Sequence, residues 1–130
     1  MTEFEYIQSA QAPAAIGPYS QAVAHGDMVF CSGQVPLIPG TKELKNESIE
    51  AATTQALQNL RAVLAAAGCH TDDVVKTGVF LTDLKEFAGM NKVYEEFFGR
   101  HRPARATVQV AALPAGARVE IDCIAMRRRS

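Results

Sequence analysis

Apolar residues recur at every third or fourth position between residues 49 and 67, which is the spacing that places them on one face of an α-helix. Ser48 directly precedes this run and can cap the helix, and Glu50 lies where the positive end of the helix dipole favours an acid. Gly68 follows the run and can adopt the left-handed conformation that ends a helix. The pattern predicts a first helix with an apolar face made of Ile49, Ala52, Ala56, Leu57, Leu60, Val63, Leu64 and Ala67.

A second helix is predicted between Asp83 and Gly99. Asp83 and Glu86, three residues later, resemble a capping box, and Gly99 would end the helix. Its expected apolar face consists of Leu84, Phe87, Tyr94, Phe97 and Phe98.

Six shorter segments have the composition or the alternation of strands. They are Glu5–Ser9, Gln21–His25, Asp27–Ser32, Val74–Leu81, Arg105–Leu113 and Arg118–Met126. Gly26 would join the second and third in a hairpin, and the turn Pro114–Gly116 would join the last two. Prolines and glycines predict loops at residues 10–20 and 33–46. The order β-β-β-α-β-α-β-β predicts an α+β domain with both helices on one face of the sheet.

Alternation in the last two strands predicts what each face of the sheet contacts. Aliphatic residues, expected beneath the helices, are Val108, Val110, Ala112, Val119, Ile121 and Cys123. The intervening residues are polar or small, but they lack the Lys and Glu pairs of a fully solvated surface. We therefore expect this second face to pack against other copies of the chain in a closed homo-oligomer.

Composition narrows the class of protein. A length of 130 residues is that of one domain, and a net charge of −1 argues against a nucleic-acid binder with a broad basic face. The three cysteines, Cys31, Cys69 and Cys123, have no metal-ligand spacing, so we expect free thiols and no zinc site. The start MTEFEYIQS is acidic, and no run of about 18 apolar residues is present. A cytoplasmic protein is expected, with an organelle such as the mitochondrion as the alternative.

Two charged residues of the last strand pair are the main candidates for chemistry. Arg105 presents a planar fork that matches a carboxylate, although it could instead pair with an acid at a strand edge. Glu120 interrupts an apolar strand and could orient water or move protons, or it could simply face solvent. Because an antiparallel pair brings distant positions together, the two side chains are expected near each other.

Other candidate residues lie in loops and on the second helix. Tyr19, in the sequence IGPYS, could close over a ligand or pack on the surface, and Ser32–Gly33 could bring backbone N–H groups close to a ligand. Asn91 could face solvent or support the site. The basic run Arg127–Arg129 is interpreted as a solvated strand end, with an RNA phosphate contact as the alternative. The histidines form no Ser–His–Asp pattern, and no glycine-rich phosphate loop is present.

Four collinear segments resemble the RidA (YjgF) family of reactive-intermediate imine deaminases. They are APAAIGPYSQAV (12–23), CSGQVP (31–36), VVKTGVFLTDLKEFAGMNKVYEEFF (74–98) and RPARATVQVAALPAGARVEID (102–122), and together they span almost the whole chain. The resemblance implies a chorismate-mutase-like α+β fold with a six-stranded mixed sheet and two helices on one face. It also implies a homotrimer whose sheets face a central barrel, with active sites at the subunit interfaces.

The resemblance further implies hydrolysis of 2-aminoacrylate and related 2-imino acids to 2-oxo acids and ammonia, without metal or cofactor. The family's carboxylate-binding arginine corresponds to Arg105 and its water-orienting acid to Glu120. Its loop tyrosine, pocket Ser–Gly pair and helix asparagine correspond to Tyr19, Ser32–Gly33 and Asn91. Thr107 stands where many bacterial members carry cysteine. An RNA-cleaving translation inhibitor and a non-catalytic small-molecule sensor or chaperone are the alternatives.

Overall fold

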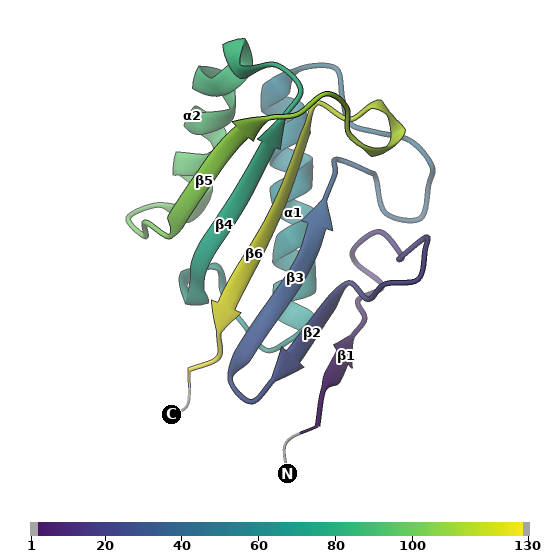
Figure 1. Cartoon of the computed structure of the whole chain (residues 1–130), viewed down its shortest axis with the longest axis vertical. Helices are drawn as coiled ribbons and strands as arrows, with labels where there is room; N and C mark the ends of the chain where they lie inside the picture. The colour runs from purple at the N-terminus through teal and green to yellow at the C-terminus, as the bar shows by residue number, and fades with distance from the viewer. Residues whose placement is uncertain (1–2, 129–130) are drawn as a thin grey trace.

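One six-stranded sheet is the framework of the chain (Figure 1). The computed structural model describes residues 3–128, and the strands lie in the order β1-β2-β3-β6-β4-β5. The strands are β1 (Glu5–Ile7), β2 (Ala22–His25), β3 (Met28–Gln34), β4 (Val74–Leu81), β5 (Ala104–Gln109) and β6 (Val119–Met126). The predicted α+β class, the order of elements and the mixed sheet are confirmed, since β4 and β5 are parallel and the other pairs antiparallel.

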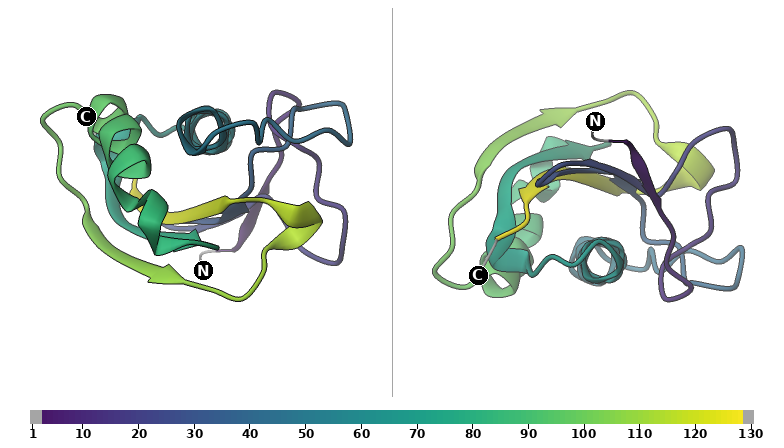
Figure 2. Two further views of the ribbon diagram at one scale, coloured as in Figure 1. Left: turned by 90° about the horizontal axis from the view of Figure 1, so that it is seen from above. Right: turned by 90° about the horizontal axis from the view of Figure 1, so that it is seen from below.

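The two helices, α1 (Ile49–Ala66) and α2 (Phe87–Phe98), cover the same face of the sheet (Figure 2). Ser48 caps α1 as predicted, with its side chain accepting a hydrogen bond from the N–H of Ala51 at 3.0 Å. Gly68 and Gly99 follow the two helices with φ of 81° and 64°, which glycine adopts without strain. The hydrophobic core lies between the helices and the sheet.

The start of the second helix differs from the prediction. Asp83 caps a short 3₁₀ turn, Leu84–Glu86, by accepting from the N–H of Lys85 at 2.9 Å. Glu86 does not complete a capping box, because its carboxylate pairs with Arg118 at 2.6 Å. The α-helix therefore begins one turn later, at Phe87, and Leu84 is exposed.

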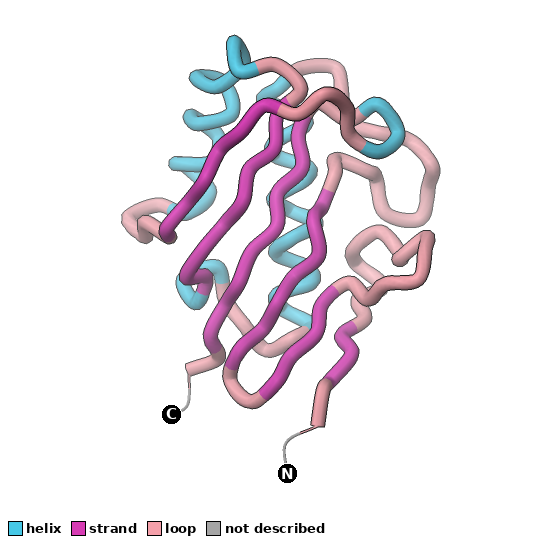
Figure 3. The backbone as a smooth tube through the Cα atoms, viewed as in Figure 1, coloured by secondary structure: helices cyan, strands magenta, loops and turns pink. Residues whose placement is uncertain are grey.

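The predicted pairing of the last two strands is wrong. β5 pairs with β4 in parallel, and β4 lies between β5 and β6 (Figure 3). The connection from Gln109 to Val119 includes the predicted turn at Pro114–Gly116, but it is long enough to cross the end of β4. The apolar β6 consequently occupies the centre of the sheet, and the shorter β5 lies at an edge, where a charged strand is tolerated.

The pattern of faces is confirmed for β6 and reversed for β5. Val119, Ile121 and Cys123 are buried beneath the helices as expected. On β5 the helix-facing positions are those of Arg105 and Thr107, and Val108 is 44% exposed on the opposite face. Within residues 3–128, no helix is both long and apolar enough to cross a membrane.

Asn59 connects α1 to the loop that follows β3. It is buried in the middle of the helix, and its Nδ2 donates to the carbonyl oxygens of Val35 and Leu37 at 3.1 and 2.8 Å. Because buried polar groups without partners cost free energy, this amide fixes the loop that continues from Gly33 and Gln34.

Replacement of Asn59 by Ala should lower the free energy of unfolding by about 2 kcal/mol, because it removes the two hydrogen bonds to the loop and the one that Asn59 accepts from Gln55. Chemical denaturation measures this loss. Gln58→Ala, at an exposed position of the same helix, is the control and should change stability by less than about 0.5 kcal/mol. Equal stability of the two variants would show that Asn59 does not anchor the loop.

Candidate active site

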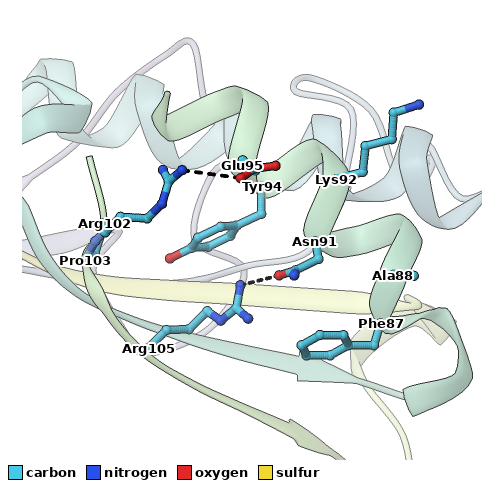
Figure 4. A pocket seen from close by; sticks show the side chains of 9 residues that line it. All are labelled: Phe87, Ala88, Asn91, Lys92, Tyr94, Glu95, Arg102, Pro103 and Arg105. Carbon is cyan, nitrogen blue, oxygen red and sulfur yellow. Dashed lines mark hydrogen bonds and ion pairs between the residues drawn. The ribbon is translucent and has the colours of Figure 1, made fainter. Parts of the chain in front are cut away.

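Arg105 projects from β5 toward α2, and its guanidinium is half-buried against that helix (Figure 4). Its Nη1 donates a hydrogen bond to Oδ1 of Asn91 at 2.7 Å. Its guanidinium carbon lies 4.7 Å from the ring centroid of Tyr94 and 5.5 Å from that of Phe87. Phe87, Asn91 and Tyr94 are four and three residues apart, so they share one face of the helix. Together they form a cradle for a cation.

The positive charge of Arg105 is not neutralised by an acid. In the described part of the chain Arg105 forms no ion pair, and Glu95, which lines the same cleft, pairs with Arg102 at 3.3 Å. Aromatic rings attract a cation without consuming its N–H groups. The cleft measures about 750 Å³, and a half-buried guanidinium with free donors there suits a carboxylate.

Thr107 follows Arg105 by two residues and therefore lies on the same side of β5. Its Oγ1 is buried and has no hydrogen-bond partner among residues 3–128. An unpaired buried hydroxyl costs free energy. Thr107 is not among the residues that line the cleft of Arg105.

Glu120 lies on β6, on the face of the sheet opposite the helices. Its carboxylate occupies the space over Gly33 of β3, where an added Cβ atom would overlap Oε2 of Glu120. The register of β3 against β6 shifts between Cys31 and Gln34, which is the irregularity of a β-bulge. Bulges are frequent beside active sites, and this one, together with the missing side chain of Gly33, makes room for the acid.

Burial raises the pKa of Glu120, and the nearby carboxylate of Asp122 raises it further. Asp122 lies two positions along β6 on the same face, and burial also raises its pKa. The N–H of Gly78 opposes that shift by donating to Oδ1 of Asp122 at 2.9 Å. A carboxyl group with a raised pKa can hold and release a proton closer to neutral pH, as general acid–base catalysis requires.

Tyr19 and Ser32 line the cleft of Glu120, a space of about 310 Å³. Oγ of Ser32 donates to the carbonyl oxygen of Ser20 at 2.6 Å. The backbone N–H of Ser32 donates to the carbonyl oxygen of Gln21 at 2.9 Å. These bonds fix the loop that carries Tyr19 against β3. The Tyr19 side chain is 52% exposed, so it is open to a ligand.

The loop is also fixed from within by the buried side chain of Gln21. Its amide nitrogen donates to the carbonyl oxygens of Ser9 and Pro13, at 3.2 and 2.7 Å, and its amide oxygen accepts from the N–H of Ser9. All the polar atoms of this side chain thereby contact the segment that precedes Tyr19.

The predicted site residues form two groups on opposite faces of the sheet. Arg105 shares a face with its register partner Thr77, which is buried, whereas Glu120 pairs with Phe80 on the other face. The expected proximity of Arg105 and Glu120 is therefore wrong within a single chain. The first group is Arg105, Asn91 and Thr107, and the second is Tyr19, Ser32, Gly33 and Glu120.

Contacts within the chain engage two residues of the basic run. Arg127 binds both carboxylate oxygens of Glu5 at 3.0 Å, which is an ion pair and not the solvated strand end that was expected. Arg128 lies 2.7 Å from the carboxylate of the buried Asp73. Arg129 lies outside the described residues.

Residues 9–127 match the protein family described as Endoribonuclease L-PSP. The chain belongs to this family. The 2-iminobutanoate/2-iminopropanoate deaminase of Salmonella typhimurium is 47% identical over 125 residues, which cover 94% of this chain and 97% of that protein. The mouse protein of the same name is 48% identical over 121 residues, covering 93% and 90%. Escherichia coli TdcF, solved with bound serine, is 43% identical with a TM-score of 0.91, over 95% of this chain and 99% of that one.

The predicted resemblance to the RidA (YjgF) proteins is thereby confirmed. Three residues support these two groups although the sequence patterns did not single them out as site residues. Tyr94 lines the cleft of Arg105, Gln21 lines the cleft of Glu120, and Asp122 lies beside Glu120. In the sequence, Tyr94 fits the helical spacing of the apolar core residues. Its separation of three residues from Asn91 is the only indication that the two side chains share one face of the helix. Asp122 lies two residues after Glu120 and, like Glu120, interrupts an apolar strand, which is a usable signal. Gln21 gives no signal in the sequence.

Replacement of Asp122 by Asn should lower the pKa of Glu120, because it removes the like charge that disfavours the ionised form. An NMR titration of the Glu120 side-chain carboxyl carbon measures the change. Glu43→Gln removes an equal charge at an exposed site and should leave this pKa unchanged. An unaltered pKa in Asp122→Asn would contradict the proposed coupling of the two acids.

Proposed function

We propose that this protein is a deaminase that hydrolyses small enamine and imine intermediates to 2-oxo acids and ammonia. The substrates would be 2-aminoacrylate, 2-iminopropanoate and 2-iminobutanoate, and two relatives are named for the last two. The observation that carries the proposal is the environment of the Arg105 guanidinium. Two aromatic rings and the amide of Asn91 hold it in place. Its remaining N–H groups are available to the carboxylate that all these substrates share. TdcF, which holds serine, also binds a small α-carboxylate.

The complete site is proposed to form between two copies of the chain in a homotrimer. The cradle of Arg105 and the acid of Glu120 lie on opposite faces of one sheet, so a neighbouring copy can bring the two groups together. Phe30 and Val108 are large apolar residues exposed on the face of Glu120, and such a surface favours contact with a partner. A closed ring of identical subunits covers this face in every copy.

Binding begins with the carboxylate of the substrate. Arg105 grips it through its free N–H groups, while Asn91 keeps Nη1 in place. Thr107 lies on the same side of β5 and is proposed to support the binding site from beneath, since its hydroxyl is buried. Tyr19 and the backbone at Ser32–Gly33 enclose the reacting end from the neighbouring copy.

Hydrolysis requires water at the carbon of the C=N bond. The enamine first tautomerises to the imine, and Glu120 holds the attacking water. As the C–O bond forms, Glu120 takes the proton of this water and the imine nitrogen gains a proton. The resulting carbinolamine loses ammonia as its hydroxyl becomes the carbonyl of the 2-oxo acid. General acid–base action contributes about 10²–10⁴-fold, which suffices because such imines also hydrolyse unaided.

This reaction consumes only water, so the proposal includes no metal or cofactor. The cytoplasm is the proposed compartment, since Cys31, Cys69 and Cys123 are free buried thiols.

The family is described as an endoribonuclease, but the charged residues of this protein support RNA cleavage less well than they support imine hydrolysis. The net charge of the chain is −1. Arg127 pairs with Glu5 and Arg128 with Asp73, so these two cations are already engaged and less available to an RNA phosphate.

Replacement of Arg105 by Lys should abolish most of the deaminase activity, because an ammonium cannot form the two-pronged contact of a guanidinium. An amino-acid oxidase generates the imine, and its decay is followed with and without the protein. Lys92→Ala, which removes a cation from the rim of the same cleft, is the control and should retain activity. Full activity of Arg105→Lys would overturn the assigned function of Arg105.

A mixture of two inactive variants tests whether the site lies between copies. Arg105→Lys and Glu120→Gln each damage one half of the site, so random mixing in a trimer restores about a quarter of the intact sites. The two variants are unfolded together, refolded and assayed, with each variant refolded alone as the control. A mixture that stays inactive, although mass spectrometry detects mixed trimers, would show that the site does not combine residues of two copies.

A further inference from the structure

Tyr94 occupies the space between α2, β4 and the guanidinium of Arg105. Its side chain is only 7% exposed, and its hydroxyl lies 2.7 Å from Oγ1 of Thr77, which is fully buried on β4. One face of its ring lies against Arg105, at 4.7 Å from the guanidinium carbon (Figure 4). The hydroxyl and the ring of Tyr94 therefore make separate contacts, one with the sheet and one with the cation.

Thr77, Tyr94 and Arg105 form a closed set of contacts. Thr77 and Arg105 are register partners in the parallel pair of β4 and β5. Tyr94 reaches Thr77 through its hydroxyl and Arg105 through its ring. A movement of the ring away from the guanidinium would stretch the buried hydrogen bond to Thr77, so the sheet itself fixes the position of the ring.

We propose that Tyr94, anchored by Thr77, is a positioning residue that holds the Arg105 guanidinium in the orientation that binds the carboxylate of the substrate. The inference rests on the proposed deaminase function and assigns to the second helix a residue that orients the anion receptor. Tyr94 acts through Arg105, and contact with the reacting atoms is left to Arg105 and the opposite half of the site.

An aromatic ring suits this task better than an acid would. A carboxylate beside Arg105 would occupy its N–H groups and compete with the substrate, whereas a ring restrains the guanidinium and leaves the donors free. Burial raises the pKa of the Tyr94 hydroxyl, so the group stays neutral and adds no competing negative charge. Asn91 contributes a neutral acceptor and uses a single nitrogen of the fork.

The test separates the ring from the hydroxyl. Tyr94→Leu removes both contacts and should raise the KM of the imine substrate about tenfold, with a smaller change in kcat, because a cation–π contact in a desolvated site contributes on this scale. Tyr94→Phe keeps the ring but removes its anchor to Thr77, so it should raise KM by an intermediate amount, about threefold. Thr77→Val, which removes the hydroxyl anchor at constant shape, should match Tyr94→Phe.

Calorimetric binding of 2-oxobutanoate, the product of the proposed reaction, supplies a second measurement that does not depend on turnover. The Kd should rise in Tyr94→Leu in parallel with KM. The neutral amide of 2-oxobutanoate, which lacks the carboxylate, should bind the unmodified protein and the variant equally.

Phe97→Leu is the matched control. Phe97 is an aromatic residue of the same helix that contacts a different cation, Arg61, at 4.5 Å, so its loss perturbs packing without touching Arg105. It should leave KM and the Kd of 2-oxobutanoate unchanged. If Phe97→Leu raised KM as much as Tyr94→Leu, the role of Tyr94 would be structural. If Tyr94→Phe and Thr77→Val left KM unchanged, Thr77 would not anchor the ring. Either result would overturn the inference.

The variant Arg105→Lys distinguishes this failure from failure of the proposed function. Loss of 2-oxobutanoate binding in Arg105→Lys together with normal binding in Tyr94→Leu would reject only the positioning role of Tyr94. Normal binding in Arg105→Lys would reject Arg105 as the carboxylate receptor, and the function proposed above would fail with it.

Discussion

A half-buried positive charge that has no acidic partner among residues 3–128 is the constraint on which the proposed site depends. A guanidinium removed from water normally requires a carboxylate to offset the loss of hydration. Arg105 instead packs against the rings of Tyr94 and Phe87 and donates one hydrogen bond to Asn91. The contacts stabilise the cation without neutralising it, so a substrate carboxylate supplies the interaction that remains to be made. This arrangement supports the proposal that the cleft between α2 and β5 receives an anion.

The topology of the sheet determines where the second half of the chemistry lies. β4 separates β5 from β6, and the register places Arg105 on the helix-covered face and Glu120 on the opposite one. A monomer therefore carries an anion receptor and an acid that do not face each other. Assembly through the face of Glu120 would cover its exposed apolar residues and complete the site in one step, which links the oligomer to the activity by geometry.

The elements of this fold and the hairpin of β2 and β3 could be predicted from local patterns, whereas the pairing of β5 could not. Helical spacing, the Ser48 cap and the glycines after both helices specify α1 and α2 from nearby residues alone. The position of β5 in the sheet depends on which of the last two strands lies at the centre. The more apolar β6 takes that position, and the sequence of β5 alone does not indicate this. Most candidate residues were predicted from their chemistry and position in the sequence, and the family resemblance added Thr107. The cradle around Arg105 was not predicted, because Tyr94 has the same helical spacing as a core residue.

The acid half of the site lowers the stability of the fold at neutral pH. Glu120 and Asp122 have pKa values raised above 4.5 and 3.8, mainly by burial, so the folded chain favours their neutral forms. Their ionised forms destabilise the fold progressively as pH rises above those ordinary values toward the raised ones, and the penalty persists at neutral pH. Gly33 and Gly78 give these carboxylates space that a side chain would otherwise fill. The chain therefore keeps two unfavourably placed acids, as expected if one of them must exchange protons with a substrate.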